Sequence, residues 1–244
     1  MKIYGLIGFP LGHSFSKKYF TEKFQKEQLQ NCFFELFPIE KIAEFKNLVS
    51  GIPDLCGLAV TIPYKQSVIP FLDTMSEEAL KVKAVNCVAF EQGRLKGYNT
   101  DVIGFERSFV PYLLKIHKRA LVLGNGGAAK AVLFVLAKLN IPFLIVSRNP
   151  KQGEISYHDL TPLIMTEHRI IINCSPVGMT PDEDEMPAIP YNSINADNYC
   201  YDLIYTPSET RFLAEGRRRG ASVKNGMDML TIQAEENWTI WNQT

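Results

Sequence analysis

The stretch 119–139 constrains the fold of this chain more than any other. After Arg119 it continues with four apolar residues, 120–123, in a short, β-prone run that predicts a strand. Gly124, Gly126 and Gly127 interrupt that strand, and the residues after them have the apolar pattern of a helix. A strand, a glycine turn and a helix, with the spacing G-x-G-x-x-A, form the arrangement that binds a dinucleotide in α/β proteins. We therefore expect a Rossmann-type unit in the second half of the chain.

Each small residue of this turn has a separate physical use. Gly124 allows the tight turn, Gly126 lets the backbone approach a pyrophosphate, and Ala129 permits close packing of helix on strand. The start of the helix offers unpaired N–H groups to phosphate oxygens. Glycines also occur in strand–helix turns that bind no nucleotide, so it is the flanking strand and helix that favour the cofactor interpretation.

The end of the next predicted strand, 143–148, indicates which dinucleotide is bound. NAD-binding folds place an acidic residue about 20 positions after the glycines, where it holds the ribose 2′-hydroxyl. Here the strand ends in Ser147 and Arg148, with Lys151 just beyond and no carboxylate. An arginine can form a bidentate, charge-assisted contact with a 2′-phosphate, which favours NADP. The alternative is that Arg148 is an ordinary surface arginine after a strand.

The first part of the chain alternates strands with helices. Strands are predicted at 3–8, 32–39 and 58–62, and helices at 17–29 and 40–49. This alternation predicts right-handed crossovers and a largely parallel sheet. Ligands of such sheets bind beyond the carboxyl ends of the strands, where the chain places four polar residues: Ser14, Ser16, Thr61 and Lys65.

Ser14, Ser16 and Lys65 also have a purely structural interpretation. Ser14 or Ser16 is suited to cap the helix that follows, whereas together the two hydroxyls suit a carboxylate. For Lys65 the structural interpretation is a solvated surface lysine, which is the commoner case for a lysine after a strand. Asp101, ahead of a long predicted helix that reaches about residue 116, has the residue type of a helix cap.

The remaining elements follow from the same patterns. Gly93 predicts a hairpin between strands at 85–90 and 95–98. The Pro-rich, acidic segment 180–198 is expected to be a solvated loop. Further helices are predicted at 77–83, 208–218 and 227–241, and further strands at 169–174, 199–205 and 221–224.

Composition excludes several classes of function. Lys plus Arg equals Asp plus Glu, at 26 each, which argues against bulk attraction to nucleic acid or anionic membrane. No apolar run approaches the ~18 residues of a membrane span, and the N-terminal apolar run is too short for a signal peptide. The five cysteines are scattered and lack C-x-x-C spacing, so we expect free thiols in a reducing cytoplasm, without zinc or disulfides.

Taken in order, the motifs of this chain resemble those of the shikimate dehydrogenase family. The resemblance runs from the first strand to the final helix. It is carried by Gly12-His-Ser-Phe-Ser16, Val60-Thr-Ile-Pro-Tyr-Lys65, Ala84-Val-Asn86, Asn99-Thr-Asp-Val-Ile-Gly104, Gly124-Asn-Gly-Gly-Ala-Ala129, Asn173-Cys-Ser-Pro-Val-Gly-Met179, Tyr201-Asp-Leu-Ile-Tyr205, and Asn225-Gly226 with Gln233-Ala234.

The resemblance implies an α/β enzyme of two domains with its active site in the cleft between them. Residues 1–102, completed by the C-terminal helix 226–244, would form the substrate domain, and residues 103–225 the Rossmann-type NADP-binding domain. The implied activity is the reversible, NADP-dependent reduction of 3-dehydroshikimate to shikimate, in the biosynthesis of chorismate and aromatic amino acids. The implied enzyme is cytoplasmic and a monomer or homodimer.

The resemblance also implies a role for particular residues. Lys65 matches the acid/base lysine of the family and Asp101 matches its partner. The carboxylate of the substrate would bind Ser14 and Ser16. The hydroxyl groups of the substrate would lie near Thr61, Lys65, Asn86, Asp101, Tyr205 and Gln233. The cofactor positions would be Glu77, Gly124, Asn125, Gly126, Gly127, Ala128, Ser147, Arg148, Lys151, Leu203 and Gly226.

Three departures from the family pattern stand out. Ala59 replaces the usual asparagine before the V-T-I-P motif, and the segment 147–152 keeps Arg148 among altered neighbours. The chain also ends soon after Trp241, where many relatives continue. Two rival functions remain: an NAD-using quinate/shikimate dehydrogenase, and a catalytically silent binding protein on the same fold.

Overall fold

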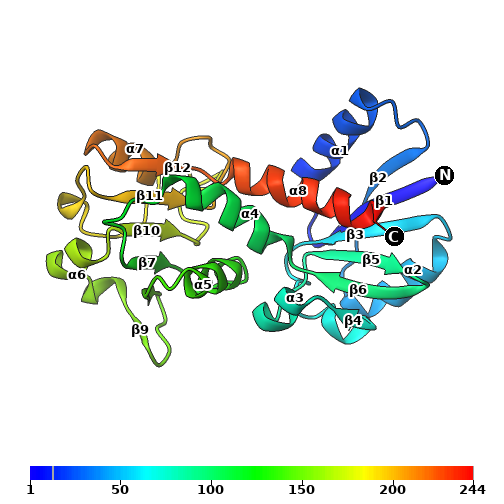
Figure 1. Cartoon of the computed structure of the whole chain (residues 1–244), viewed down its shortest axis with the longest axis horizontal. Helices are drawn as coiled ribbons and strands as arrows, with labels where there is room; N and C mark the ends of the chain where they lie inside the picture. Colours follow the sequence, from blue (N-terminus) through cyan, green and yellow to red (C-terminus); the bar gives the residue numbers. More distant parts are fainter. Residues whose placement is uncertain (13, 244) are drawn as a thin grey trace. The chain divides into compact units, whose positions relative to one another are not determined.

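The computed structural model of the protein describes every residue except His13 and Thr244, and it divides into two compact units. Unit 1 comprises Met1–Thr100 and Gln233–Thr244, and unit 2 comprises Asp101–Ile232. Each unit contains one six-stranded sheet (Figure 1). The expected α/β class with a Rossmann-type unit is confirmed.

The sheet of unit 1 is mixed. Its strand order is β2-β1-β3-β5-β6-β4. The strands are β1 (Lys2–Gly8), β2 (Cys32–Pro38), β3 (Leu55–Val60), β4 (Thr74–Met75), β5 (Cys87–Glu91) and β6 (Arg94–Tyr98). β1 pairs in parallel with β2 and β3, but β5 runs antiparallel to both β3 and β6. The parallel arrangement expected for the first three strands is therefore confirmed, and the antiparallel part of the sheet begins at β5, because the hairpin at Gly93 turns the chain straight back without a crossover helix.

Helices cover both faces of this sheet, and the alternation of strand side chains decides which helix lies on which face. These helices are α1 (Phe15–Lys26), α2 (Phe45–Gly51), α3 (Glu77–Val82) and α8 (Met227–Asn242), with short 3₁₀ turns at Ile42–Glu44 and Ile69–Phe71. Tyr4 of β1 packs with Phe20 of α1 and Trp241 of α8. Ile7, on the opposite face of the same strand, packs with Phe45 of α2.

The last helix is part of the core of unit 1. The Nε1–H of Trp241 donates to the carbonyl of Val88 at 3.0 Å, and both groups are buried. A β-carbon at Gly57 of β3 would overlap the Trp241 ring, so the missing side chain makes room for the indole. The apolar residues of α8 thus pack against strands β1, β3 and β5.

The sheet of unit 2 is entirely parallel. Its strands are β7 (Ala120–Leu123), β8 (Phe143–Val146), β9 (Glu154–Ile155), β10 (Ile170–Asn173), β11 (Tyr199–Asp202) and β12 (Ser222–Lys224). The order β12-β11-β10-β7-β8-β9 reads 6-5-4-1-2-3 within the unit. This is the doubly wound order of dinucleotide-binding folds, in which the switch point lies between the first and fourth strands, here β7 and β10.

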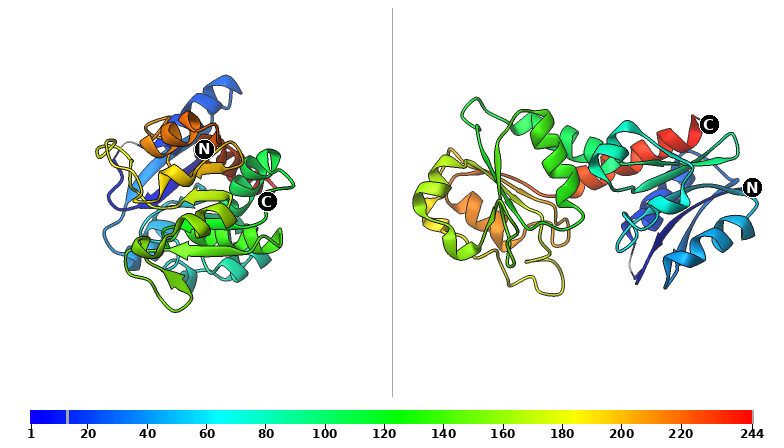
Figure 2. Two further views of the ribbon diagram at one scale, coloured as in Figure 1. Left: turned by 90° about the vertical axis from the view of Figure 1, so that its left-hand side faces the viewer. Right: turned by 90° about the horizontal axis from the view of Figure 1, so that it is seen from below.

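Both faces of this second sheet are also covered, as further views show (Figure 2). Its helices are α4 (Thr100–Phe109), α5 (Ala129–Lys138), α6 (Pro162–Glu167) and α7 (Arg211–Arg218), with 3₁₀ turns at Val110–Tyr112, Tyr157–Asp159 and Tyr191–Ser193. Phe105 of α4 packs edge-on against Tyr201 of β11. Phe212 of α7 packs instead with Leu121 and Cys200.

Several predicted elements differ in the structure. The helix expected to reach residue 116 ends at Phe109, because Pro111 lacks the N–H that would continue it. The strands β4 and β9 and the helix α6 were not predicted. The acidic segment 180–198 is not merely a solvated loop, since Ile189 and Ile194 are buried in the core of unit 2. None of the helices in the described residues is long and apolar enough to cross a membrane.

Candidate active site

The two serines predicted to bind a carboxylate lie at the start of α1, directly after β1. Ser14 is the N-cap, and its Oγ accepts a long hydrogen bond from the N–H of Lys17 at 3.4 Å. Ser16 is the second residue of the helix. Both are partly buried. The capping interpretation is therefore correct for Ser14, while the hydroxyl of Ser16 is not needed as a cap.

Thr61 and Lys65 lie on a turn that follows β3 and is held in place by hydrogen bonds of its backbone. The N–H of Thr61 donates to the carbonyl of Ile7 at 2.9 Å, and the N–H of Val85 donates to the carbonyl of Lys65 at 2.7 Å. The buried Tyr64 hydroxyl donates to the carbonyl of Ile39 at 2.6 Å. These contacts fix the turn, so the partly buried Lys65 projects from an ordered backbone.

Asn86 and Gln233 are brought together from distant parts of the chain. The Nδ2 of Asn86 lies 3.4 Å from the Oε1 of Gln233, although the two residues are 147 positions apart. Both are nearly inaccessible to solvent, at 3% and 9% exposure.

Asp101 is also buried, but it lies inside the first turn of α4, which begins at Thr100. The interpretation of Asp101 as the cap of that helix is therefore wrong.

The glycine turn of unit 2 has the shape of a phosphate cradle. Gly124 has a φ of +100°, a conformation that favours glycine. A β-carbon at Gly126 or Gly127 would meet no atom within 4 Å, so the space above this turn is open. Helix α5 begins behind it with Ala128 as N-cap and no capping side chain. An open cradle of backbone N–H groups at a helix N-terminus fits a pyrophosphate.

The turn after β8 carries the residues expected to select the cofactor. Ser147 is buried and accepts from the N–H of Asn149 at 3.2 Å, whereas Arg148 is exposed. Glu154 of β9, which was not predicted, accepts from Asn125 Nδ2 at 2.9 Å and from the N–H of Lys151 at 3.1 Å. One carboxylate thus ties the glycine turn to the turn after β8. No motif pointed to Glu154, because β9 itself had no signal in the sequence.

The segments around β11 are organised by a buried carboxylate. Asp202, with no exposed surface, accepts from Thr210 Oγ1 at 2.7 Å, from the Ile204 N–H at 3.0 Å and from Asn173 Nδ2 at 3.1 Å. Burial raises the pKa of this carboxyl to about 7, although the three hydrogen bonds oppose the shift. Its place directly after a parallel strand is a signal that could have identified it.

This carboxylate supports the predicted positions Leu203, Tyr205 and Gly226. Gly226 donates its N–H to the carbonyl of Ile204 at 3.0 Å, and Leu203 donates its own to the carbonyl of Asn173 at 3.0 Å. Burial raises the pKa of Tyr205, so its phenol is neutral at pH 7. Glu77, the remaining cofactor candidate, belongs to unit 1, where it is exposed in the first turn of α3 and paired with Lys81.

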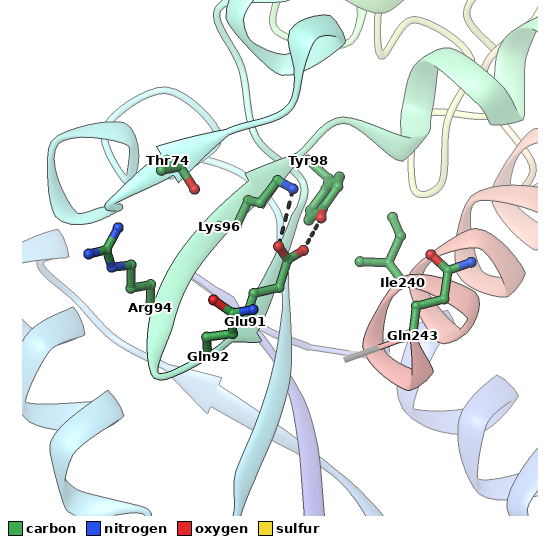
Figure 3. A pocket seen from close by; sticks show the side chains of 8 residues that line it. All are labelled: Thr74, Glu91, Gln92, Arg94, Lys96, Tyr98, Ile240 and Gln243. Atoms are coloured by element: carbon green, nitrogen blue, oxygen red, sulfur yellow. Dashed lines mark hydrogen bonds and ion pairs between the residues drawn. The ribbon is translucent and has the colours of Figure 1, made fainter.

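Unit 1 also contains a hollow of about 740 Å³ that none of the predicted site residues lines (Figure 3). Glu91 lies at its centre, 3.1 Å from the Lys96 ammonium and hydrogen-bonded to the Tyr98 hydroxyl. These contacts lower the pKa of Glu91, with the Tyr98 bond the largest cause. The central charged groups of the hollow therefore satisfy one another.

Comparison with known proteins decides the family. The family model for the shikimate dehydrogenase substrate binding domain matches residues 6–88. A shikimate dehydrogenase (NADP(+)) from Carboxydothermus hydrogenoformans is 36% identical over an alignment that covers 98% of this chain and 91% of that protein. The chain belongs to the shikimate dehydrogenase family. The resemblance predicted from the motifs is thereby confirmed.

Other members of the shikimate dehydrogenase family match as completely. The Clostridium beijerinckii shikimate dehydrogenase (NADP(+)) is 38% identical, with 100% of this chain and 93% of that protein aligned. The crystal structure of the Thermus thermophilus shikimate 5-dehydrogenase in complex with NADP(H) and shikimate superimposes with a TM-score of 0.87 at 28% identity. That alignment covers 100% of this chain and 94% of the other.

Proposed function

We propose that the protein catalyses the NADP(H)-linked interconversion of 3-dehydroshikimate and shikimate. The observation that carries this proposal is the 36% identity, along nearly the whole of both chains, with a shikimate dehydrogenase (NADP(+)). The open glycine cradle at the start of α5 supports it independently, because a dinucleotide enzyme needs such a place for the pyrophosphate.

Unit 1 and the N-terminal part of α8 provide the substrate side of the proposed site. We assign residues 1–102 with 226–244 to substrate binding and residues 103–225 to cofactor binding. Ser14 and Ser16, at a helix start directly after β1, are suited to the substrate carboxylate. Thr61, Asn86 and Gln233 would hold the substrate's hydroxyl groups, with Tyr205 contributed by unit 2.

Unit 2 provides most of the proposed cofactor contacts. The backbone of Gly124–Ala128, Asn125 included, would hold the pyrophosphate, and Ser147, Arg148 and Lys151 would surround the 2′-phosphate. Leu203 and Gly226 would adjoin the nicotinamide, with Glu77 contributed by unit 1. When bound, NADPH supplies the hydride, and the protein supplies orientation and electrostatics.

Lys65 is the proposed proton donor and acceptor. In the reductive direction, in which the bound cofactor would supply a hydride to the ketone carbon, the ammonium of Lys65 would give one proton to the ketone oxygen to complete the alcohol. In the oxidative direction Lys65 takes that proton back. Asp101 is proposed to orient Lys65. A positioned group of this kind contributes about 10²–10⁴-fold in rate.

A turnover assay with NADP and NAD, each with shikimate and quinate, tests the proposal. We expect activity with shikimate and NADP, and a loss of at least ~100-fold in Lys65→Ala and Lys65→Met with NADP affinity unchanged. Lys18→Ala, which removes an exposed lysine of α1, is the matched control and should behave as the wild type. Absence of turnover in the wild type would support a silent binding protein, and a preference for quinate with NAD would support the other rival. Near-normal turnover in the Lys65 variants would remove Lys65 from the mechanism.

The cellular location and the assembly state stay predictions. The five cysteines are free thiols, which is expected for a protein of the reducing cytoplasm. The assembly expected is a monomer or a homodimer, and light scattering of the purified protein distinguishes the two.

A further inference from the structure

We propose that Asn237 is a positioning residue that fixes which end of the Gln233 amide is presented to the substrate. The inference rests on the proposed function, in which Gln233 holds a substrate hydroxyl. Asn237 lies one helical turn beyond Gln233 on α8 and is 1% exposed. Residues four apart lie on the same face of a helix, so the two amides are neighbours.

The side-chain amides of Asn86, Asn237 and Gln233 form one hydrogen-bond network with Thr100. The direction of its hydrogen bonds is set by a group that can only donate. The backbone N–H of Thr100 donates to the Oδ1 of Asn86 at 2.7 Å. Since a backbone N–H cannot accept, the Asn86 amide has its oxygen on that side and its Nδ2 on the other. That Nδ2 lies 2.9 Å from the Thr100 hydroxyl oxygen and 3.4 Å from the Oε1 of Gln233.

The Thr100 hydroxyl in turn determines the orientation of the Asn237 amide. Its oxygen accepts from Asn86, and its single proton is directed to the Oδ1 of Asn237 at 2.7 Å, the shorter of its two contacts with amide oxygens. The Asn237 amide is thereby oriented with its Nδ2 toward Gln233, at 3.4 Å from Oε1. Two donors, Asn86 and Asn237, therefore converge on the same oxygen.

This convergence decides the chemistry that Gln233 offers. Rotating the amide by 180° would place its NH₂ against two other NH₂ groups in a buried network, where unpaired polar groups are costly. The oxygen thus stays inside and Nε2 lies on the other side of the amide. Gln233 would consequently donate a hydrogen bond to a substrate oxygen. Each contact to Oε1 is 3.4 Å long and individually weak, so the orientation depends on the two donors together.

Two variants separate this role from simple packing. Asn237→Asp keeps an acceptor for Thr100 but replaces the donor to Gln233 with a second oxygen, which favours the rotated amide. Asn237→Leu fills a similar volume without a donor and serves if the buried carboxylate prevents folding. We expect either variant to raise the KM for shikimate about fivefold, as for one lost hydrogen bond, with the Kd for NADP unchanged and kcat within about twofold.

The control is Asn242→Asp, the same substitution on the same helix. The Asn242 side chain is exposed and bonds only to the carbonyl of Trp238 among the hydrogen bonds of the described residues, so wild-type kinetics are expected. A double-mutant cycle with Gln233→Ala completes the test. If Asn237 acts through Gln233, the Asn237 substitution changes the shikimate KM little once Gln233 is absent.

The outcomes distinguish this inference from the proposed function. A wild-type enzyme inactive with shikimate, or a Gln233→Ala variant of normal KM, refutes the role assigned to Gln233. With that role intact, an unchanged KM in the Asn237 variants, or an effect fully additive with Gln233→Ala, overturns the positioning role of Asn237.

Discussion

The backbone carbonyl of Leu203 occupies the space into which a β-carbon on Gly226 would project. The backbone of both residues is held in place by further hydrogen bonds: the N–H of Gly226 donates to the carbonyl of Ile204, and the N–H of Leu203 donates to the carbonyl of Asn173. Neither can move without displacing the segment after β11 or the start of α8. A side chain at residue 226 is therefore excluded by packing, although the conformation of Gly226 itself is an ordinary one.

Gly226→Ala should damage the fold and the cofactor site together. Overpacking of this kind costs about 1–3 kcal/mol, and the shift falls on Leu203, a proposed neighbour of the nicotinamide. We expect a melting temperature lower by several degrees and weaker NADP binding, measured by calorimetry and fluorescence titration. A variant with wild-type values of both would show that the backbone relaxes there at no cost.

Gly126→Ala should have the opposite profile. A β-carbon at this position meets no protein atom within 4 Å, so the melting temperature should not change. It would project into the space proposed for the pyrophosphate, and we expect the Kd for NADP to rise at least tenfold. An unchanged Kd would place the pyrophosphate elsewhere.

Arg148 should determine the choice between NADP and NAD. A charge-assisted hydrogen bond contributes roughly 1.5–3 kcal/mol, and only NADP carries the 2′-phosphate that would receive it. Arg148→Ala should raise the KM for NADP more than tenfold and leave that for NAD nearly unchanged. Arg119→Ala is the matched control, because Arg119 precedes β7 and pairs with Glu167. Equal effects on both cofactors would contradict the assignment.

Alanine substitutions of Ser14 and Ser16, at the start of α1, should distinguish helix capping from substrate binding. Ser14→Ala removes an N-cap whose hydrogen bond is long, so a loss of about 0.5–1 kcal/mol of stability is expected together with weaker substrate binding. Ser16→Ala places a good helix former inside the helix and should raise the shikimate KM alone. Denaturant unfolding and steady-state kinetics measure the two effects. A normal shikimate KM in Ser16→Ala would leave Ser16 without a role.

Asp202 should make the protein less stable as the pH rises. Its folded pKa of about 7 lies above the reference value of ~3.9, so the folded state holds a proton that the unfolded chain releases. The stabilisation is complete below pH ~4, declines toward pH ~7 and is absent above it. Asp202→Asn keeps an acceptor for Asn173 and lacks this titration. Between about pH 5 and 8 we expect the wild type to lose about 2 kcal/mol relative to the variant, by denaturant unfolding. Parallel pH profiles of the two proteins would contradict the raised pKa.

Local chemistry made much of this protein predictable from its sequence. The apolar runs and the glycine turn at residue 124 specify a strand, a tight turn and a helix through contacts between near neighbours. Gly93 likewise predicts its hairpin, since a turn residue acts on the residues beside it. The motifs at Lys65, Asp101 and Arg148 named candidate residues because each lies at the end of a strand or the start of a helix.

Only the tertiary structure decided the features that depend on where distant segments meet. The meeting of Asn86 with Gln233, the burial that raises the pKa of Asp202 and the contact of Gly226 with Leu203 leave no periodic trace in the sequence. The antiparallel pairing of β5 with β3 and the short strand β9 with Glu154 are of the same kind. Their common cause is that strand pairing and the burial of polar groups are set by packing across the fold, whereas sequence patterns report only on neighbours along the chain.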